Sequence, residues 1–172
     1  MSHAVMDQQD RSTTTYMITS PALGSIEVSG EAVMHFTEAL WGFPERTAYA
    51  LLPAARQGLW WLLSVSEPHT TFVLADPFVG HPEYGIDLGE SERDALQIVE
   101  PTDALALVMV ALPMTPSEPI TGNFRAPIVF NISKGLAQQV VNRDEHYSLR
   151  EPMDLNAYPV QVDGPIIDWT RA

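Results

Sequence analysis

The chain has 172 residues, 45% of them hydrophobic, which is enough for one domain with its own core. Its formal net charge is −13, with 22 acidic and 9 basic residues, so we expect no direct binding to the phosphate backbone of DNA or RNA. No cysteine is present, which excludes disulfides and thiolate chemistry and fits a cytoplasmic protein. No apolar run approaches the roughly 20 residues of a membrane helix, and the polar start of the chain predicts no secretory signal.

The first half of the chain is predicted to consist of short strands after a disordered tail. Residues 1–12 are polar and without periodicity, which predicts disorder. Residues 25–28 alternate polar and apolar side chains, and 33–36 form another short β-type run, so Gly30 between them predicts a hairpin. Runs rich in aliphatic and aromatic residues predict further strands over 49–53, 59–65 and 71–75.

The second half adds one helix and further strands. Ser91 and Asp94 have the spacing of a capping box, which predicts a short helix over about residues 91–98. The apolar run 105–112 is short enough between its flanking prolines to favour a strand buried on both faces. Two last strands, 128–132 and 136–141, are predicted to pair as a hairpin.

Together these elements predict a mostly β fold, a small antiparallel barrel-like or sandwich domain with one short helix. We expect this domain to cover residues 13–151. The stretch 152–172 has no sustained pattern, so we expect an extension that is partly docked or flexible.

The segment from Asn123 to Asn131 is predicted to form two half-strands hinged at Pro127. A cation, Arg125, lies inside this otherwise apolar segment, and a half-buried cation needs partners. Arg125 is therefore either a structural clamp, paired with a carboxylate such as Asp76, or a contact for a ligand or partner.

The pattern of residues gives little support for a catalytic site. The histidines lack metal-ligand spacing, so no metal site is predicted, and no nucleophile elbow, phosphate loop or dinucleotide fingerprint is present. Asp76 ends an apolar strand, but an Asp-Pro pair there is common turn chemistry. An acidic belt surrounds the predicted helix and is either a solvated face or a surface that attracts a basic partner; it comprises Glu83, Asp87, Glu90, Glu92, Asp94, Glu100 and Asp103.

Several stretches match one known family in order and spacing: 24–28, 36–53, 64–68, 72–78, 82–84, 123–131, and 139–141 with Tyr147 and Arg150. On these residues the chain resembles the FliW family of bacterial flagellar assembly factors, from about Gly24 to Arg150. One departure is Trp41, where the family usually has a proline.

The resemblance implies a small antiparallel β-barrel-like fold and a non-enzymatic binding protein without cofactors. FliW-like proteins bind flagellin in the cytoplasm and also bind the translational regulator CsrA, relieving CsrA repression of flagellin translation. The acidic belt is a candidate for steering CsrA. Candidate partner-binding residues, drawn from the matching stretches, are Phe43, Asp76, Asn123, Phe124, Arg125, Asn131, Tyr147 and Arg150.

Two alternatives remain open at the level of sequence. One is a small barrel enzyme, hydrolase-like, that uses Asp76 with a histidine. The other is an interaction module with no flagellar role, which the departure at Trp41 and the long C-terminal extension allow.

Overall fold

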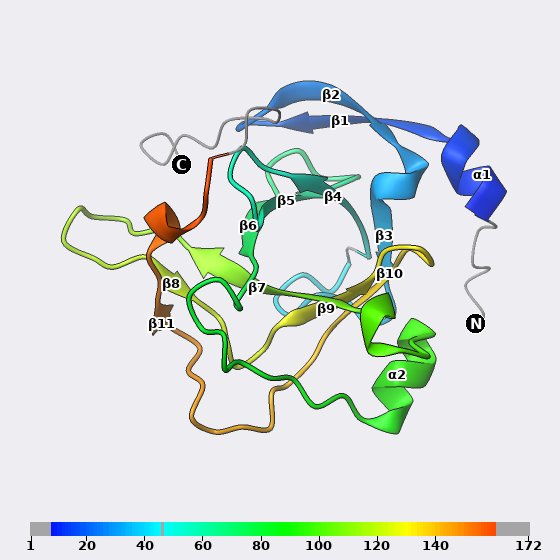
Figure 1. The fold of residues 1–172 in the computed structure, drawn as a ribbon. Coiled ribbons are helices and arrows are strands. Elements are labelled where there is room, and N and C mark those ends of the chain that lie inside the picture. Colours follow the sequence, from blue (N-terminus) through cyan, green and yellow to red (C-terminus); the bar gives the residue numbers. More distant parts are fainter. Residues whose placement is uncertain (1–7, 46, 161–172) are drawn as a thin grey trace.

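The computed structural model describes residues 8–45 and 47–160, most of which belong to short strands or the loops between them (Figure 1). The strands are β1 Thr15–Ser20, β2 Gly24–Ser29, β3 Val33–Phe36, β4 Ala48–Pro53, β5 Leu59–Ser64, β6 Thr71–Ala75, β7 Leu105–Ala111, β8 Thr121–Gly122, β9 Ile128–Asn131, β10 Leu136–Gln139 and β11 Glu151–Pro152. The helices are α1 Gln8–Thr13 and α2 Glu90–Leu96, with short 3-10 turns at Gly30–Ala32, Pro101–Asp103 and Leu155–Ala157.

Seven of the strands close into a barrel (Figure 1). Their order is β7-β6-β5-β4-β3-β10-β9, and β9 pairs back onto β7 to complete the ring. The neighbours pair antiparallel except β3 and β10, which run parallel over a short register that aligns Leu136 with His35 and Ala137 with Phe36. The predicted fold class, mostly β and barrel-like, is therefore confirmed.

Both faces of the barrel wall are covered, which explains why its strands are continuously apolar. One core cluster receives side chains from all seven barrel strands, among them Tyr49, Leu62 and Phe130, and so fills the interior. A second cluster lies outside the wall and combines residues of the β1–β2 ribbon with residues of β4 to β7. Trp60 and Trp61 accordingly point to opposite faces of β5, with Trp61 only 6% exposed and Trp60 half-buried.

The hairpin predicted around Gly30 is wrong. β2 pairs with β1, which precedes it, whereas β3 pairs with β4 and β10. Gly30 itself lies in a 3-10 turn, and its amide donates to the Thr14 carbonyl at 2.7 Å, which ties the turn to the chain before β1. Gly30 therefore lies in the connection between the β1–β2 ribbon and the barrel, and it does not form a hairpin turn.

The predicted helix is confirmed, but it begins at a different cap. α2 starts at Glu90, and the Gly89 amide donates to Glu92 Oε2 at 2.8 Å. The predicted pairing of Ser91 with Asp94 is therefore wrong, because Ser91 already lies inside the helix. The acidic residue that caps the helix is Glu92, one position after Ser91.

Both ends of the described chain are packed against the barrel. Residues 8–12 were expected to be disordered, but they lie in α1, whose Arg11 side chain is only 4% exposed. At the other end, Tyr158 is 2% exposed and its hydroxyl donates to the Asp76 carbonyl at 2.6 Å. Residues 1–7 and 161–172, parts of the predicted tail and extension, lie outside the described residues.

Candidate functional site

Aromatic rings from separate segments of the chain pack together around Phe124. The Phe124 ring lies edge-on to Tyr84 at 5.2 Å and stacks near Tyr147 at 6.3 Å, while His81 packs at 4.6 Å. The Tyr84 hydroxyl donates to the Phe124 carbonyl at 2.7 Å, and burial raises the pKa of Tyr84 to about 12. Because Phe124 is 0% exposed, it supports this surface from beneath, and the half-buried Tyr147 forms the outer part.

The segment 123–131 is a strand only in its second half. Residues 123–127 connect β8 to β9, and the Asn123 side chain fixes this connection by accepting the Ala126 amide at 2.9 Å. The backbone of Arg125 is held from both sides: its amide donates to the Ser148 carbonyl at 3.2 Å, and its carbonyl accepts the Asn142 amide at 2.7 Å. The connection is therefore well ordered by hydrogen bonds although it is not a strand.

The clamp expected between Arg125 and Asp76 is not formed. The Asp76 carboxylate accepts the Phe78 amide at 2.9 Å and so closes a turn at the end of β6. Arg125 instead lies toward the loop after β10. There Asp144 has a lowered pKa because it accepts hydrogen bonds from His146, and the charge of Arg125 lowers it further.

The hydrolase alternative would need Asp76 beside a histidine. The carboxylate of Asp76 bonds the Phe78 amide, whereas the His81 ring packs against Phe124, and no hydrogen bond joins the two described side chains. Among the described residues, no group of three or more His, Cys, Asp or Glu side chains is placed to hold a metal ion. No helix within those residues has the length and apolar character needed to cross a membrane.

Asn131 has a structural role, because its side chain bonds the C-terminal end of α2. Its side-chain amide donates to the carbonyls of Leu96 at 2.9 Å and Gln97 at 3.2 Å, and the residue is 1% exposed. Helix carbonyls at this end lack partners within the helix, so Asn131 satisfies two of them. It thereby holds α2 against β9 and β10.

The remaining candidates lie apart. Phe43 is half-buried and packs edge-on to Phe72 at 5.1 Å, in the turn that carries the exposed Trp41. Arg150 is exposed, and its backbone amide donates to Ser148 Oγ at 3.0 Å. The structure thus brings together Asn123, Phe124, Arg125, Tyr147 and Arg150 and leaves Phe43, Asp76 and Asn131 elsewhere.

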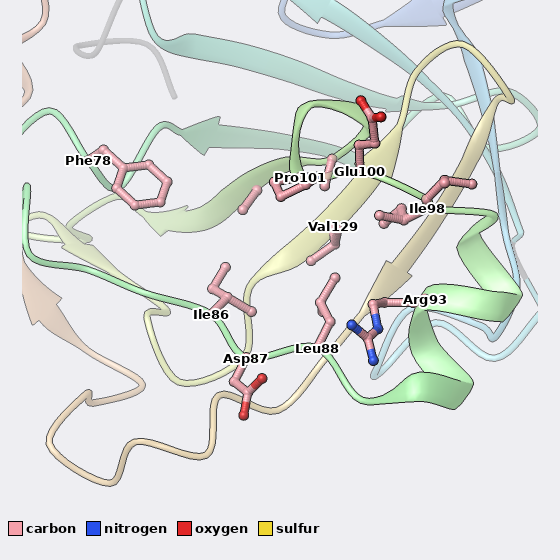
Figure 2. A pocket seen from close by; sticks show the side chains of 12 residues that line it. Phe78, Ile86, Asp87, Leu88, Arg93, Ile98, Glu100, Pro101 and Val129 are labelled. Carbon is pink, nitrogen blue, oxygen red and sulfur yellow. The ribbon is translucent and has the colours of Figure 1, made fainter.

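A groove that the sequence did not predict lies between α2 and the barrel (Figure 2). It has a volume of about 500 Å³, and its floor is made of Ile86, Leu88, Ile98 and Val129. The backbone of segment 86–88, whose Ile86 and Leu88 side chains point inward, forms one wall, and the turn after α2 forms the other (Figure 2). Because Val129 on β9 comes from a distant part of the sequence, only the folded chain assembles this floor.

Charged groups line the groove on opposite sides. Asp87 projects from the wall at residues 86–88, and Glu100 from the wall near Pro101 (Figure 2). Behind Glu100, the Asp103 carboxylate accepts the amides of Glu100 at 2.8 Å and Val99 at 3.0 Å, which lowers the pKa of Asp103. The acidic belt noted in the sequence therefore borders an apolar groove.

Comparison with known proteins gives a consistent family assignment. The family model described as FliW protein matches residues 17–153. A flagellar assembly factor FliW of Treponema denticola is 28% identical over 142 residues, covering 81% of this chain and 96% of the relative. One from Syntrophus aciditrophicus is 34% identical over 134 residues, covering 77% and 84%.

A solved structure agrees in fold as well as sequence. The crystal structure of the flagellar assembly factor FliW superposes with a TM-score of 0.72 at 29% identity, covering 81% of this chain and 98% of that structure. The family match over residues 17–153 includes the barrel, β2 and most of β1, and the resemblance found in the sequence is confirmed. The chain belongs to the FliW family of flagellar assembly factors.

Proposed function

We propose that this chain is a non-enzymatic flagellar assembly factor that binds flagellin and the RNA-binding regulator CsrA in the cytoplasm. Binding to CsrA relieves repression of flagellin translation. Flagellin competes for the same factor, so CsrA is freed when flagellin accumulates. The observation that carries the proposal is the family match over residues 17–153, together with the shared barrel.

The charge of the chain supports the choice of partner class. A chain of net charge −13 repels nucleic acid, whereas it attracts a basic RNA-binding protein over a distance of about a Debye length. Two of its acidic residues, Asp87 and Glu100, also line a groove with an apolar floor, which is a suitable surface for a protein partner.

The test uses the full chain with flagellin and CsrA from the same organism. Binding is measured by isothermal titration calorimetry with each partner alone, and then with CsrA in the presence of flagellin. We expect each partner to bind and flagellin to reduce the binding of CsrA. If neither partner binds, the proposal is contradicted and an interaction module with no flagellar role is favoured.

A translation assay separates binding from antagonism. A reporter that carries the flagellin leader is translated with CsrA, with and without this chain. We expect the chain to restore translation and added flagellin to suppress it again. If the chain binds CsrA but does not restore translation, the function is limited to partner binding.

A further inference from the structure

We propose that the groove between α2 and the barrel is a docking site for a protein segment that is apolar on one face and carries Lys or Arg at both edges of that face. The inference rests on the proposed function in one respect, namely that the occupant belongs to a protein partner. It adds which surface is used and what chemistry the partner segment has.

The floor of the groove offers apolar surface that the described residues leave uncovered. Ile86, Leu88 and Ile98 are half-buried, and they surround the buried Val129. Two further lining residues are apolar and open to solvent, namely Val99, which is 89% exposed, and Phe78, which is 44% exposed. Contiguous exposed apolar surface of this kind marks interaction sites on proteins.

The charges select the kind of segment that fits. Asp87 and Glu100 stand on opposite walls, and their carboxylates point away from the floor (Figure 2). An occupant whose Lys or Arg side chains reach over both edges of the groove therefore meets a carboxylate on each side. Arg93 supplies the one positive charge among the described lining residues. Glu90, Glu92, Asp94 and Asp103 add negative charge on α2 and on the turn after it.

The same charges disfavour other occupants. A second copy of this chain carries a net charge of −13 and would bring like charges together. Nucleic acid would place phosphates against carboxylates. A basic amphipathic helix or extended segment avoids both costs, and helices of this type commonly bind with one apolar face in a groove.

The walls are held in place before a partner arrives. Asn131 bonds the C-terminal carbonyls of α2, and Asp103 bonds the amides of Val99 and Glu100. Leu96 under the helix is 0% exposed and packs with Val129, Leu136 and Val140. A preformed groove loses less conformational entropy on binding, so it favours affinity.

The test compares groove variants with matched controls elsewhere on the surface. Val99→Glu places a charge on the apolar rim, and Asp87→Lys with Glu100→Lys reverses both walls. The controls are Met114→Glu, at a residue 94% exposed on the β7–β8 loop, and Glu27→Lys, on β2 across the barrel from α2 (Figure 1). Circular dichroism and thermal unfolding confirm that each variant is folded.

Each full-length variant is titrated with CsrA and with flagellin from the same organism. For at least one partner we expect Val99→Glu to raise Kd about tenfold, and the double reversal to lower the association rate about tenfold at low salt. Both controls should bind like the unaltered chain. Equal binding by all variants, while the unaltered chain still binds, overturns the groove but leaves the proposed function standing.

Two other results also overturn the inference. If the unaltered chain binds neither partner, the proposed function fails and the groove assignment fails with it. If analytical ultracentrifugation shows a dimer that Val99→Glu dissociates, the occupant is a second copy instead of a basic segment.

Discussion

Arg11 joins two parts of the barrel from outside the region that defines the family. Its guanidinium donates to the Glu31 carbonyl at 2.8 Å, just before β3, and to the Ser133 carbonyl at 3.0 Å, in the turn between β9 and β10. These groups flank the short parallel pairing of β3 with β10. Arg11 therefore bridges the one parallel seam among the described barrel strands, although it precedes the family match at residues 17–153.

We expect Arg11→Ala to lower the free energy of unfolding by about 2 to 4 kcal/mol, because it leaves several carbonyls without donors. Urea denaturation measures this loss, and hydrogen exchange should show faster opening at residues 33–36 and 132–137. Arg150→Ala, at an exposed residue, is the control and should change stability little. A loss below about 0.5 kcal/mol in Arg11→Ala would show that the seam holds without the bridge.

Tyr84 makes stability depend on alkaline pH. Burial raises its pKa to about 12, so the folded state holds the phenolic proton more tightly than the unfolded chain, where the pKa is about 10. This contribution is complete below about pH 10 and is lost as the pH rises toward 12. We expect Tyr84→Phe to flatten the fall in urea midpoint across that range, and an unchanged slope would assign the dependence to other groups.

At the scale of elements, α2 ends in a backbone conformation that costs free energy. Gln97 follows the helix with φ 55, in the left-handed region, and it is the one non-glycine residue with positive φ among those described. Glycine adopts this conformation without steric cost and is the usual residue after a helix. The end of α2 is also the wall of the groove, so its stability affects the proposed docking site.

We therefore expect Gln97→Gly to raise the free energy of unfolding by about 0.5 kcal/mol. Ala95→Gly, at an exposed position inside the same helix, should lower it by about 1 kcal/mol. Urea denaturation of both variants gives the comparison. Destabilisation by Gln97→Gly would mean that the glutamine side chain contributes more than its backbone strain costs.

At the scale of the whole molecule, the charge should govern how fast a basic partner is captured. The net charge is −13, and the acids near α2 lie at the surface, where salt screens them. We expect Kd for CsrA to rise at least several-fold between about 0.05 and 0.5 M salt, mainly through a slower association rate. Surface plasmon resonance at stepped salt concentrations measures this, and rates indifferent to salt would remove the steering role of the acidic belt.

Local patterns were sufficient for β4 to β7 and for the presence of α2. The apolar runs that became β4, β5, β6 and β7 are short, rich in aliphatic and aromatic residues, and bounded by turn residues. The hairpin of β9 with β10 was also predictable, because its turn lies within a few residues of both strands. These features depend only on side chains that are close in sequence.

Pairing between distant segments was decided by the tertiary structure. Gly30 has the local signal of a hairpin, yet β2 pairs with β1 and β3 lies parallel to β10, about a hundred residues away. Local pattern cannot rank such choices, because each competing pairing buries similar apolar surface.

The sequence by itself determined the fold class, the family and the acidic character of the chain. Composition, alternation of side chains and ordered family stretches carry those features, and none of them requires knowing which residues meet. Only the tertiary structure decided that Arg11 bridges the β3–β10 seam and that Val129 lies under the groove beside α2. Barrel closure brings these residues together, and closure depends on register between strands that are far apart in the chain.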